Sequence, residues 1–133
     1  MALQNLDTVN DLSKITPEDI DSIGDHYGNT LADRHNGIKT HQVRNIFSSV
    51  LALRTKQKST KDGWNEEIHN ELVLIKPKLA YASGRQKNVK PLYELLSKAI
   101  SATVDSNDKK KGLTNFIQLV ESIVAYHKFY GGN

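Results

Sequence analysis

One acid and one histidine in this sequence have a spacing that could hold a metal ion. Glu66 and His69 form a Glu-x-x-His motif, the ligand spacing used by carboxylate di-metal helical bundles. Such sites need a second copy of the motif on another helix, and the 133 residues contain none. Cysteine, glycine-rich phosphate loops and nucleophile-elbow patterns are also absent from the sequence. We therefore expect no catalytic residue, no metal site and no cofactor, and we interpret His69 as an ordinary surface residue.

Basic residues, in contrast, are grouped in a way that suits binding. The first 38 residues hold seven acids and two bases, a net charge of −5, whereas residues 39–133 hold eight acids and sixteen bases, a net charge of +8. Residues 76–90 contain five bases and no acid. Such a cluster suits a polyanion, because neutralising phosphates releases counterions and so drives binding. The alternative is a solvated surface, which the overall net charge of +3 favours.

The spacing of apolar residues is helical along almost the whole chain, and no segment alternates with the period of a β-strand. Thr16, Thr40 and Asn88 are placed to cap the first, second and fourth helices. Turns or loops are expected at Asn36-Gly37, Asp62-Gly63 and Asp105–Gly112. Three further boundaries are expected: the first helix ends at about Arg34, the third follows Trp64, and Gly131-Gly132 ends the fifth. The sequence therefore predicts an all-α fold, a compact bundle of about five helices in one domain over residues 1–133.

Residues 76–85, KPKLAYASGR, end the third predicted helix with an unusual mixture of residues. Pro77 cannot donate a backbone hydrogen bond, so we expect a kink. The apolar stripe nevertheless continues from Ile75 to Leu79, so the chain should not reverse there.

Three residues of this segment, Lys78, Tyr81 and Arg85, are spaced i, i+3 and i+7 and share a side away from the apolar stripe. Ala80 and Gly84 are small and allow close approach to the backbone. The pattern fits a phosphate-binding corner, with Tyr81 in the core, at a subunit contact or stacked on a base. It also fits a simple helix end, with Gly84 as the C-cap and bases favoured by the helix dipole.

Other candidate residues can also be interpreted in more than one way. Arg44 and Arg54 in the second helix could pair with acids of the bundle or with phosphate. His127 falls on the apolar stripe of the fifth helix, so it is either a core histidine with a satisfied hydrogen bond or a contact to a ligand. Tyr126 and Tyr130 share a helix face and suit packing within the bundle or between subunits, or stacking on a base.

The ends and the hydropathy of the chain bear on its location. The N-terminus, MALQNLDTVND, lacks the basic start and apolar run of a signal peptide. The longest apolar run, Leu72–Ile75, is far shorter than a membrane span. Together with the lack of cysteine, these features predict a soluble, cytoplasmic protein that does not bind membranes.

Three segments resemble a known family. KPKLAYASGR at 76–85 and FIQLVESIVAYHKFYGG at 116–132 resemble signature segments of the small subunit of the type III-A CRISPR effector, the Csm complex. IKTHQVRNIFSSV at 38–50 resembles the start of that family's first well-matched helix. Ser83 and Ser122 stand where alanine is expected, and both changes are small. The resemblance covers residues 38–132, and the acidic first 38 residues carry no recognised motif.

The resemblance implies an all-helical subunit without catalytic activity. In the family, several copies stack beside the crRNA-bearing backbone subunits and contact the sugar–phosphate backbone of the target RNA without reading its sequence. The implied partners are target RNA, crRNA, the backbone and large subunits, and other copies of this chain. The RNA-binding residues carried over are Arg44, Lys76, Lys78, Arg85 and Lys128; Arg54 and Lys87 are added on charge and placement. A helical adaptor that only joins proteins is the alternative.

Overall fold

The structure, a computed structural model, describes residues 2–33, 35 and 37–132. Within these ranges the chain forms five α helices and three short 3₁₀ helices, and no β-strand. The α helices are α1 (Pro17–Leu31), α2 (Thr40–Ser59), α3 (Glu66–Arg85), α4 (Lys90–Val104) and α5 (Lys109–Phe129). The 3₁₀ helices are η1 (Leu12–Lys14), η2 (Lys61–Gly63) and η3 (Lys87–Val89). The predicted all-α bundle of about five helices is confirmed.

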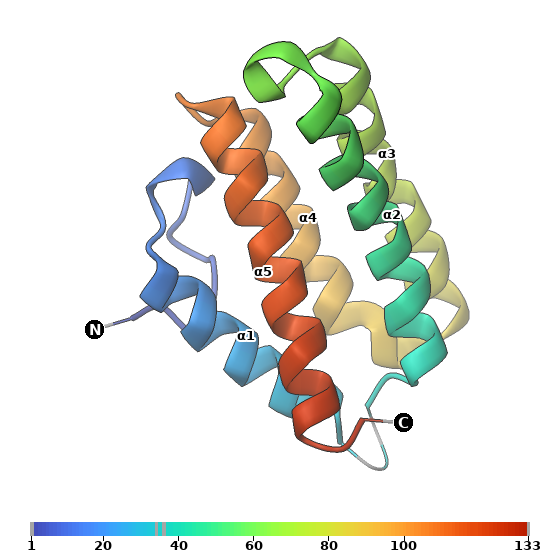
Figure 1. The fold of residues 1–133 in the computed structure, drawn as a ribbon. Helices are drawn as coiled ribbons and strands as arrows, with labels where there is room; N and C mark the ends of the chain where they lie inside the picture. Colours follow the sequence, from blue (N-terminus) through green and yellow to red (C-terminus); the bar gives the residue numbers. More distant parts are fainter. Residues whose placement is uncertain (1, 34, 36, 133) are drawn as a thin grey trace.

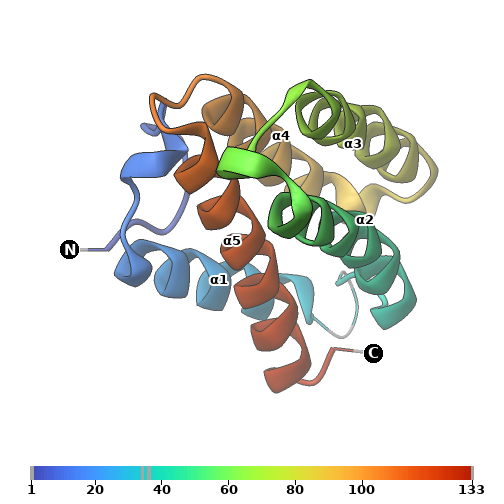
Figure 2. The same cartoon turned by 45° about the horizontal axis from the view of Figure 1, so that its top comes forward.

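Helix α5 lies at the centre of the arrangement. The α2–α3 and α4–α5 hairpins stand side by side, and α1 crosses α5 on the side away from α2 (Figure 1). The turned view shows α5 between α1 and α2, with α3 and α4 behind (Figure 2). Fully buried residues such as Ile68, Leu72, Leu96 and Phe116 come from α3, α4 and α5. Burying these side chains supplies most of the free energy that holds the helices together.

The start of α1 has the predicted cap. The Thr16 hydroxyl accepts from the Asp19 amide at 3.1 Å, and the Asp19 carboxylate accepts from the Thr16 amide at 3.0 Å, which completes a capping box. Helix α1 ends at Leu31. Arg34 and Asn36, where we expected the helix end and the following turn, lie outside the described residues.

Two other predicted caps are wrong, because both side chains bind distant backbone. Thr40 is the first residue of α2 rather than its cap, and its hydroxyl donates to the Gly132 carbonyl at 3.3 Å. The Asn88 side chain donates to the Gly37 carbonyl at 2.7 Å, while Val89 stands at the N-cap of α4. The predicted loop over residues 105–112 is also too long, since α5 begins inside it with Asp108 as a side-chain cap.

Helix α3 continues through Pro77 to Arg85, so the predicted continuation past the proline is confirmed. Gly84 lies inside the helix, and Gln86 is the C-cap. The interpretation of Gly84 as a helix terminator is therefore wrong. The turn at Asp62-Gly63 is confirmed, since both residues have positive φ angles, 65° and 68°.

The contact between α1 and α5 explains two glycines inside α1, Gly24 and Gly28, whose helix propensity is low. A Cβ atom on Gly28 would lie 2.4 Å from Tyr126 Cβ and 2.8 Å from the His127 amide nitrogen. A Cβ on Gly24 would lie 1.9 Å from Ser122 Oγ. The two glycines thus let the helix backbones approach closely, which outweighs their low helix propensity.

Tyr126 of α5 and Tyr130, the C-cap residue of α5, reinforce this contact. Tyr126 donates to the Asp21 carboxylate at 2.5 Å, and Tyr130 donates to the Asp25 carboxylate. The bond to Asp21, with smaller contributions from burial and nearby carboxylates, raises the pKa of Tyr126 to about 12. The packing role predicted for these tyrosines within the bundle is confirmed.

A tyrosine whose folded-state pKa is raised stabilises the fold below its ordinary pKa near 10, and the stabilisation is lost as pH rises towards 12. We therefore expect the urea midpoint of the protein to fall between pH 9 and pH 11.5. In Tyr126→Phe the midpoint should be lower at pH 9 but should fall less over this range. Urea titrations followed by circular dichroism test this, and an equal fall in both proteins would contradict the assigned role of Tyr126.

Candidate nucleic-acid interface

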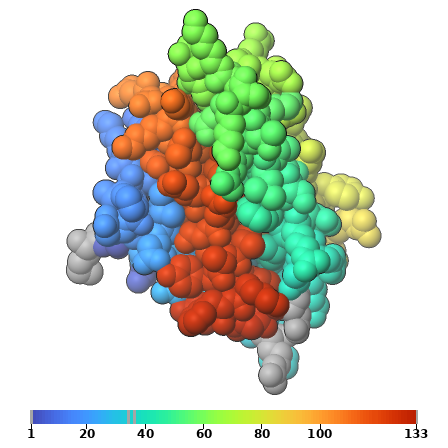
Figure 3. Space-filling model, viewed as in Figure 1, coloured from blue at the N-terminus to red at the C-terminus, as the bar shows by residue number. Residues whose placement is uncertain are grey.

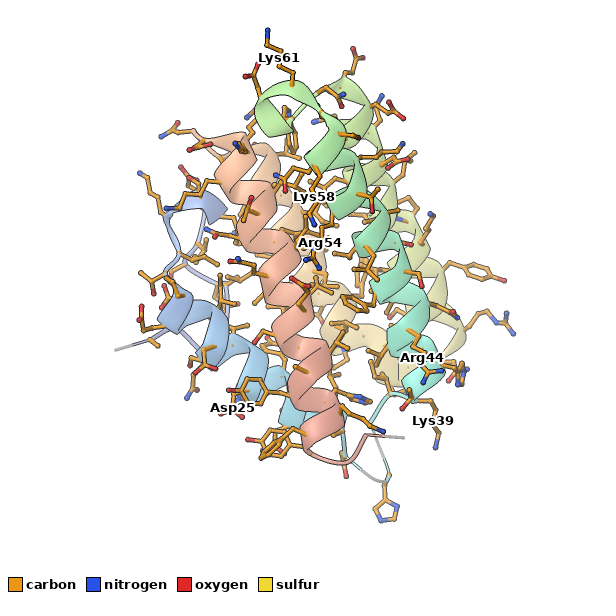
Figure 4. All side chains as sticks on the ribbon, in the orientation of Figure 1. Asp25, Lys39, Arg44, Arg54, Lys58 and Lys61 are labelled. Atoms are coloured by element: carbon orange, nitrogen blue, oxygen red, sulfur yellow. The ribbon has the colours of Figure 1, made fainter. Side chains whose placement is uncertain are left out.

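Helix α2 presents bases without any acid. Its twenty residues include Arg44, Arg54, Lys56 and Lys58 and no aspartate or glutamate. Figure 4 shows Arg44 near the start of α2, Arg54 and Lys58 further along it, and Lys39 and Lys61 beyond its two ends. Arg44 and Lys58 are exposed, while Lys56 is engaged by Glu67 and Glu71 of α3, each at 2.5 Å. Arg44 and Lys58 therefore leave exposed positive charge near both ends of α2.

A groove of about 440 Å³ separates α2 from the second half of α3. Lys78, Tyr81 and Arg85 line it from α3, and all three side chains are exposed. The predicted shared side of these residues is thus confirmed. Tyr81 is 68% exposed, which rules out the core position that we had left open for it.

The far end of the groove is organised by polar contacts. The Arg85 guanidinium lies over the Tyr81 ring, with Cζ 5.8 Å from the ring centroid. Gln42 of α2 donates through Nε2 to Gln86 Oε1 at 2.8 Å and accepts from the Lys39 amide at 2.7 Å. The Gln42–Gln86 bond therefore links the start of α2 to the end of α3.

The groove and the outer face of α2 are neighbouring surfaces of the same helix. Successive residues of an α helix are rotated by about 100° about the helix axis. Arg44 therefore lies between two sides of α2. One is the side of His41 and Asn45, which lines the groove, and the other is the side of Arg54, which faces α5. We define the basic surface as the exposed bases of α2 and α3 that this arrangement connects: Arg44, Arg54, Lys58, Lys78 and Arg85.

Arg54 marks the boundary of this surface. Its guanidinium reaches Glu121 Oε2 of α5 at 2.8 Å, and the two side chains remain 44% and 34% exposed. Exposed pairs of this kind contribute about 0–1 kcal/mol, so the pairing restrains Arg54 only weakly. Lys128 is exposed and lies seven residues, about two helical turns, beyond Glu121. It therefore extends the same side of α5.

The structure does not bring Lys76 into the basic surface. Its side chain is half-buried, and Nζ donates to Ser101 Oγ of α4 at 2.6 Å. Lys87 lies in η3 and is exposed, and it borders a shallow hollow together with Arg85. Of the sequence-predicted residues on α3, Lys78 and Arg85 thus lie together in the groove, Lys87 lies beside them, and Lys76 faces α4.

Acids gather on the opposite side of α5. Asp21 and Asp25 lie on α1, where they accept from Tyr126 and Tyr130, and Figure 4 shows Asp25 across α5 from the bases of α2. In the space-filling view, the atoms of α5 separate those of α1 from those of α2 (Figure 3). Asp21 and Asp25, two of the seven acids among the first 38 residues, therefore lie on the side of α5 away from the bases of α2.

A family model described as Csm2 Type III-A matches residues 14–133. The chain belongs to the Csm2 family. CRISPR system Cms protein Csm2 of Enterococcus italicus is 33% identical over 98 residues, which cover 71% of this chain and 69% of that protein. The protein of the same name from Streptococcus thermophilus is 31% identical over 108 residues, 81% of this chain and 80% of that protein.

The family assignment confirms the resemblance described above and extends it. The matched region begins at residue 14 and so includes α1, which carried no motif that we recognised. Csm2 is a subunit of the type III-A CRISPR complex. The basic surface is therefore a feature of a chain that works within a larger assembly.

Two histidines of this Csm2-family chain contact other residues of the bundle. His127 is 3% exposed, and its Nε2 lies 3.0 Å from the Ile38 carbonyl, so the interpretation as a satisfied core histidine is confirmed. His69 packs edge-on against Trp64 with ring centroids 6.1 Å apart.

Among the described residues, no group of three or more histidines or acids is placed to hold a metal ion. No helix in the described ranges has the length and apolarity needed to cross a bilayer.

Sequence reasoning selected Arg44 and Arg54 of α2 but missed the other bases on and beside this helix. Residues 34–61 of the Csm2-family chain contain seven lysines and arginines and no acid, a longer acid-free stretch than residues 76–90. This signal was present in the sequence, and it identifies the exposed Lys39, Lys58 and Lys61 as further candidates. Neither stretch alone shows that α2 and α3 lie side by side.

Proposed function

We propose that this chain is a non-catalytic, RNA-binding structural subunit of a type III-A CRISPR ribonucleoprotein in cytoplasmic antiviral defence. It contacts the duplex of target RNA and crRNA through backbone phosphates. The observation that carries the proposal is the basic surface, because it combines exposed bases of two neighbouring helices with no acid on α2. Its partners are target RNA, crRNA, the backbone and large subunits, and other copies of the chain.

Phosphate contacts account for the side chains found on this surface. Arg44, Lys78 and Arg85 are long, exposed donors on two rigid helices, so they can follow a polyanion without recognising one sequence. In an RNA-guided complex the sequence is read by base pairing between guide and target, so the protein needs only to hold the backbone. Catalysis would require a constellation of groups that the residues of this surface do not supply.

An adaptor role without RNA contact is supported by different residues. Leu74 on α3 is 58% exposed and Phe129 at the end of α5 is 75% exposed, and neither belongs to the basic surface. Exposed apolar side chains of this size suit contacts with neighbouring proteins. The two roles separate experimentally, because only RNA binding depends steeply on salt.

The proposal predicts a steep dependence of RNA affinity on salt. For single-stranded RNA, log K should fall linearly with log salt at a slope of about −0.7 per neutralised phosphate, so three contacts give a slope of about −2. Fluorescence anisotropy with two unrelated RNA sequences should give the same slope and similar affinities. Because several copies share one RNA, the measurement is made with the isolated chain and with the assembled complex. Salt-independent binding, or equal RNA affinity of complexes with and without this subunit, would contradict the proposal.

A further inference from the structure

The groove between α2 and α3 contains more than phosphate contacts require. Besides Lys78 and Arg85, it has an apolar floor of Ile46, Leu79 and Val89 and an exposed aromatic ring at its edge, Tyr81. Phosphates are bound by cations and N–H groups and gain nothing from an apolar floor. A nucleobase, in contrast, has an apolar face, a polar edge and a neighbouring phosphate.

We propose that this groove holds one unpaired nucleobase of the bound RNA, with its face stacked on Tyr81. The inference rests on the proposed RNA-binding function and adds a base contact to it. Tyr81 sits on a helix face with two-thirds of its surface exposed, so most of the ring is available to a ligand. Aromatic rings stack on any base, because every base has a π-face, so the contact need not select a sequence.

The cations flank this ring along α3. Lys78 precedes Tyr81 by three residues and Arg85 follows it by four, which places them one turn to either side of the ring. Phosphates on the two sides of a splayed base could therefore be neutralised at the same time. Arg85 already lies over the Tyr81 ring and would cover part of the bound base or move to its phosphate.

The opposite wall supplies groups for the edge of the base. Asn45 and Ser49 of α2 line the groove, and among the described residues neither side chain donates or accepts a hydrogen bond. Gln86 receives the bond from Gln42 on its Oε1, which leaves its amide nitrogen as a donor. Amides and hydroxyls of this kind can serve as donor or acceptor to the edges of different bases.

The size of the groove agrees with this occupant. Its volume of about 440 Å³ lies in the lower part of the range of roughly 300–1,000 Å³ that holds small ligands. A single nucleotide fits this range, whereas stacked or paired bases need a larger and flatter site. A side chain of a neighbouring protein is the competing occupant, and the experiment below separates the two.

Binding of base-bearing and abasic RNA by the full-length chain tests the inference. Fluorescence anisotropy at low salt would compare a 12-nucleotide RNA with an abasic strand of the same length and charge. Stacking of one base is worth about 1–3 kcal/mol, so the natural RNA should bind about 5- to 150-fold more tightly. Tyr81→Ala should abolish this ratio and leave the affinity for the abasic strand unchanged, whereas Tyr81→Phe should keep the ratio. Leu74→Ala, on α3 but outside the groove, is the matched control and should also keep it.

The outcomes distinguish this inference from the function on which it rests. Equal affinity of the wild-type chain for both strands would overturn the base site while leaving phosphate binding intact. A ratio that survives Tyr81→Ala would also overturn it, and loss of copurifying subunits in that variant would then assign Tyr81 to a protein contact. If the wild-type chain bound neither strand, the base site and the proposed RNA-binding function would both be contradicted.

Discussion

Replacing Arg44, Lys78 and Arg85 together with glutamine should lower the affinity for RNA by on the order of a hundredfold. Each exposed base is expected to contribute about 1 kcal/mol through a charge-assisted contact to phosphate, and three such contacts correspond to that factor. The loss should be similar for unrelated RNA sequences, because phosphate contacts carry no base information. All three side chains are exposed, so circular dichroism and thermal melting should show a folded protein.

The matched control removes the same charge elsewhere. The control carries three substitutions of bases outside the basic surface: Lys14→Gln, Lys98→Gln and Lys111→Gln. Lys14 ends η1, and Lys98 lies beside Asp7 and Glu94. Lys111 lies one turn before Asn115, whose side chain donates to the Leu12 carbonyl of η1. This variant should bind RNA within a few-fold of the wild type. The basic-surface variant should also reduce the slope of log K against log salt by about 2. Equal losses in the two variants would show that net charge, rather than this surface, governs binding.

Gly28→Ala should destabilise the fold by about 2 kcal/mol. The new Cβ would meet Tyr126 Cβ at 2.4 Å and the His127 amide nitrogen at 2.8 Å, so α1 must move away from the backbone of α5. Overpacking costs about 1–3 kcal/mol, and contacts as short as 2.4 Å and 2.8 Å place this site at the upper end of that range. Subtracting about 1 kcal/mol for the better helix propensity of alanine leaves a loss of about 2 kcal/mol. Urea denaturation followed by circular dichroism would measure the difference.

Gly84→Ala is the control for this prediction. Gly84 also lies inside a helix, near its C-terminal end. Apart from its chain neighbours and the backbone of its own helix, no atom of the described residues lies within 4 Å of the position that its Cβ would take. Alanine should therefore stabilise the fold, by up to about 1 kcal/mol, through helix propensity alone. If both variants shifted the urea midpoint in the same direction, the close approach of α1 to α5 would not be the reason for glycine at position 28.

The sequence predicted correctly those parts of the fold that depend on interactions between residues close together in the chain. The Thr16 cap, the turn at Asp62-Gly63 and the continuation of α3 through Pro77 all depend on residues within a few positions of each other. Thr40 and Asn88 failed as predicted caps because their side chains bind the carbonyls of Gly132 and Gly37, 92 and 51 residues away. Such partners become neighbours only in the folded chain.

The same distinction applies to the candidate site. Helical spacing correctly placed Lys78, Tyr81 and Arg85 on one side of α3, because this follows from the geometry of a single helix. It could not show that Lys76 turns towards Ser101 of α4, nor that α2 closes the other wall of the groove. The basic surface is formed by the packing of two helices, and neither helix indicates it alone.

The most direct test of the proposed function is a crosslinking map of the assembled type III-A complex bound to target RNA. Photocrosslinked RNA would be digested and the attached peptides identified by mass spectrometry. The account predicts crosslinks on residues 39–61 and 76–90, which carry the basic surface, and none on the acidic residues 16–31 of α1 and its cap. RNA crosslinks on neighbouring subunits alone, with none on either basic segment, would contradict the proposed RNA-binding role and favour the adaptor.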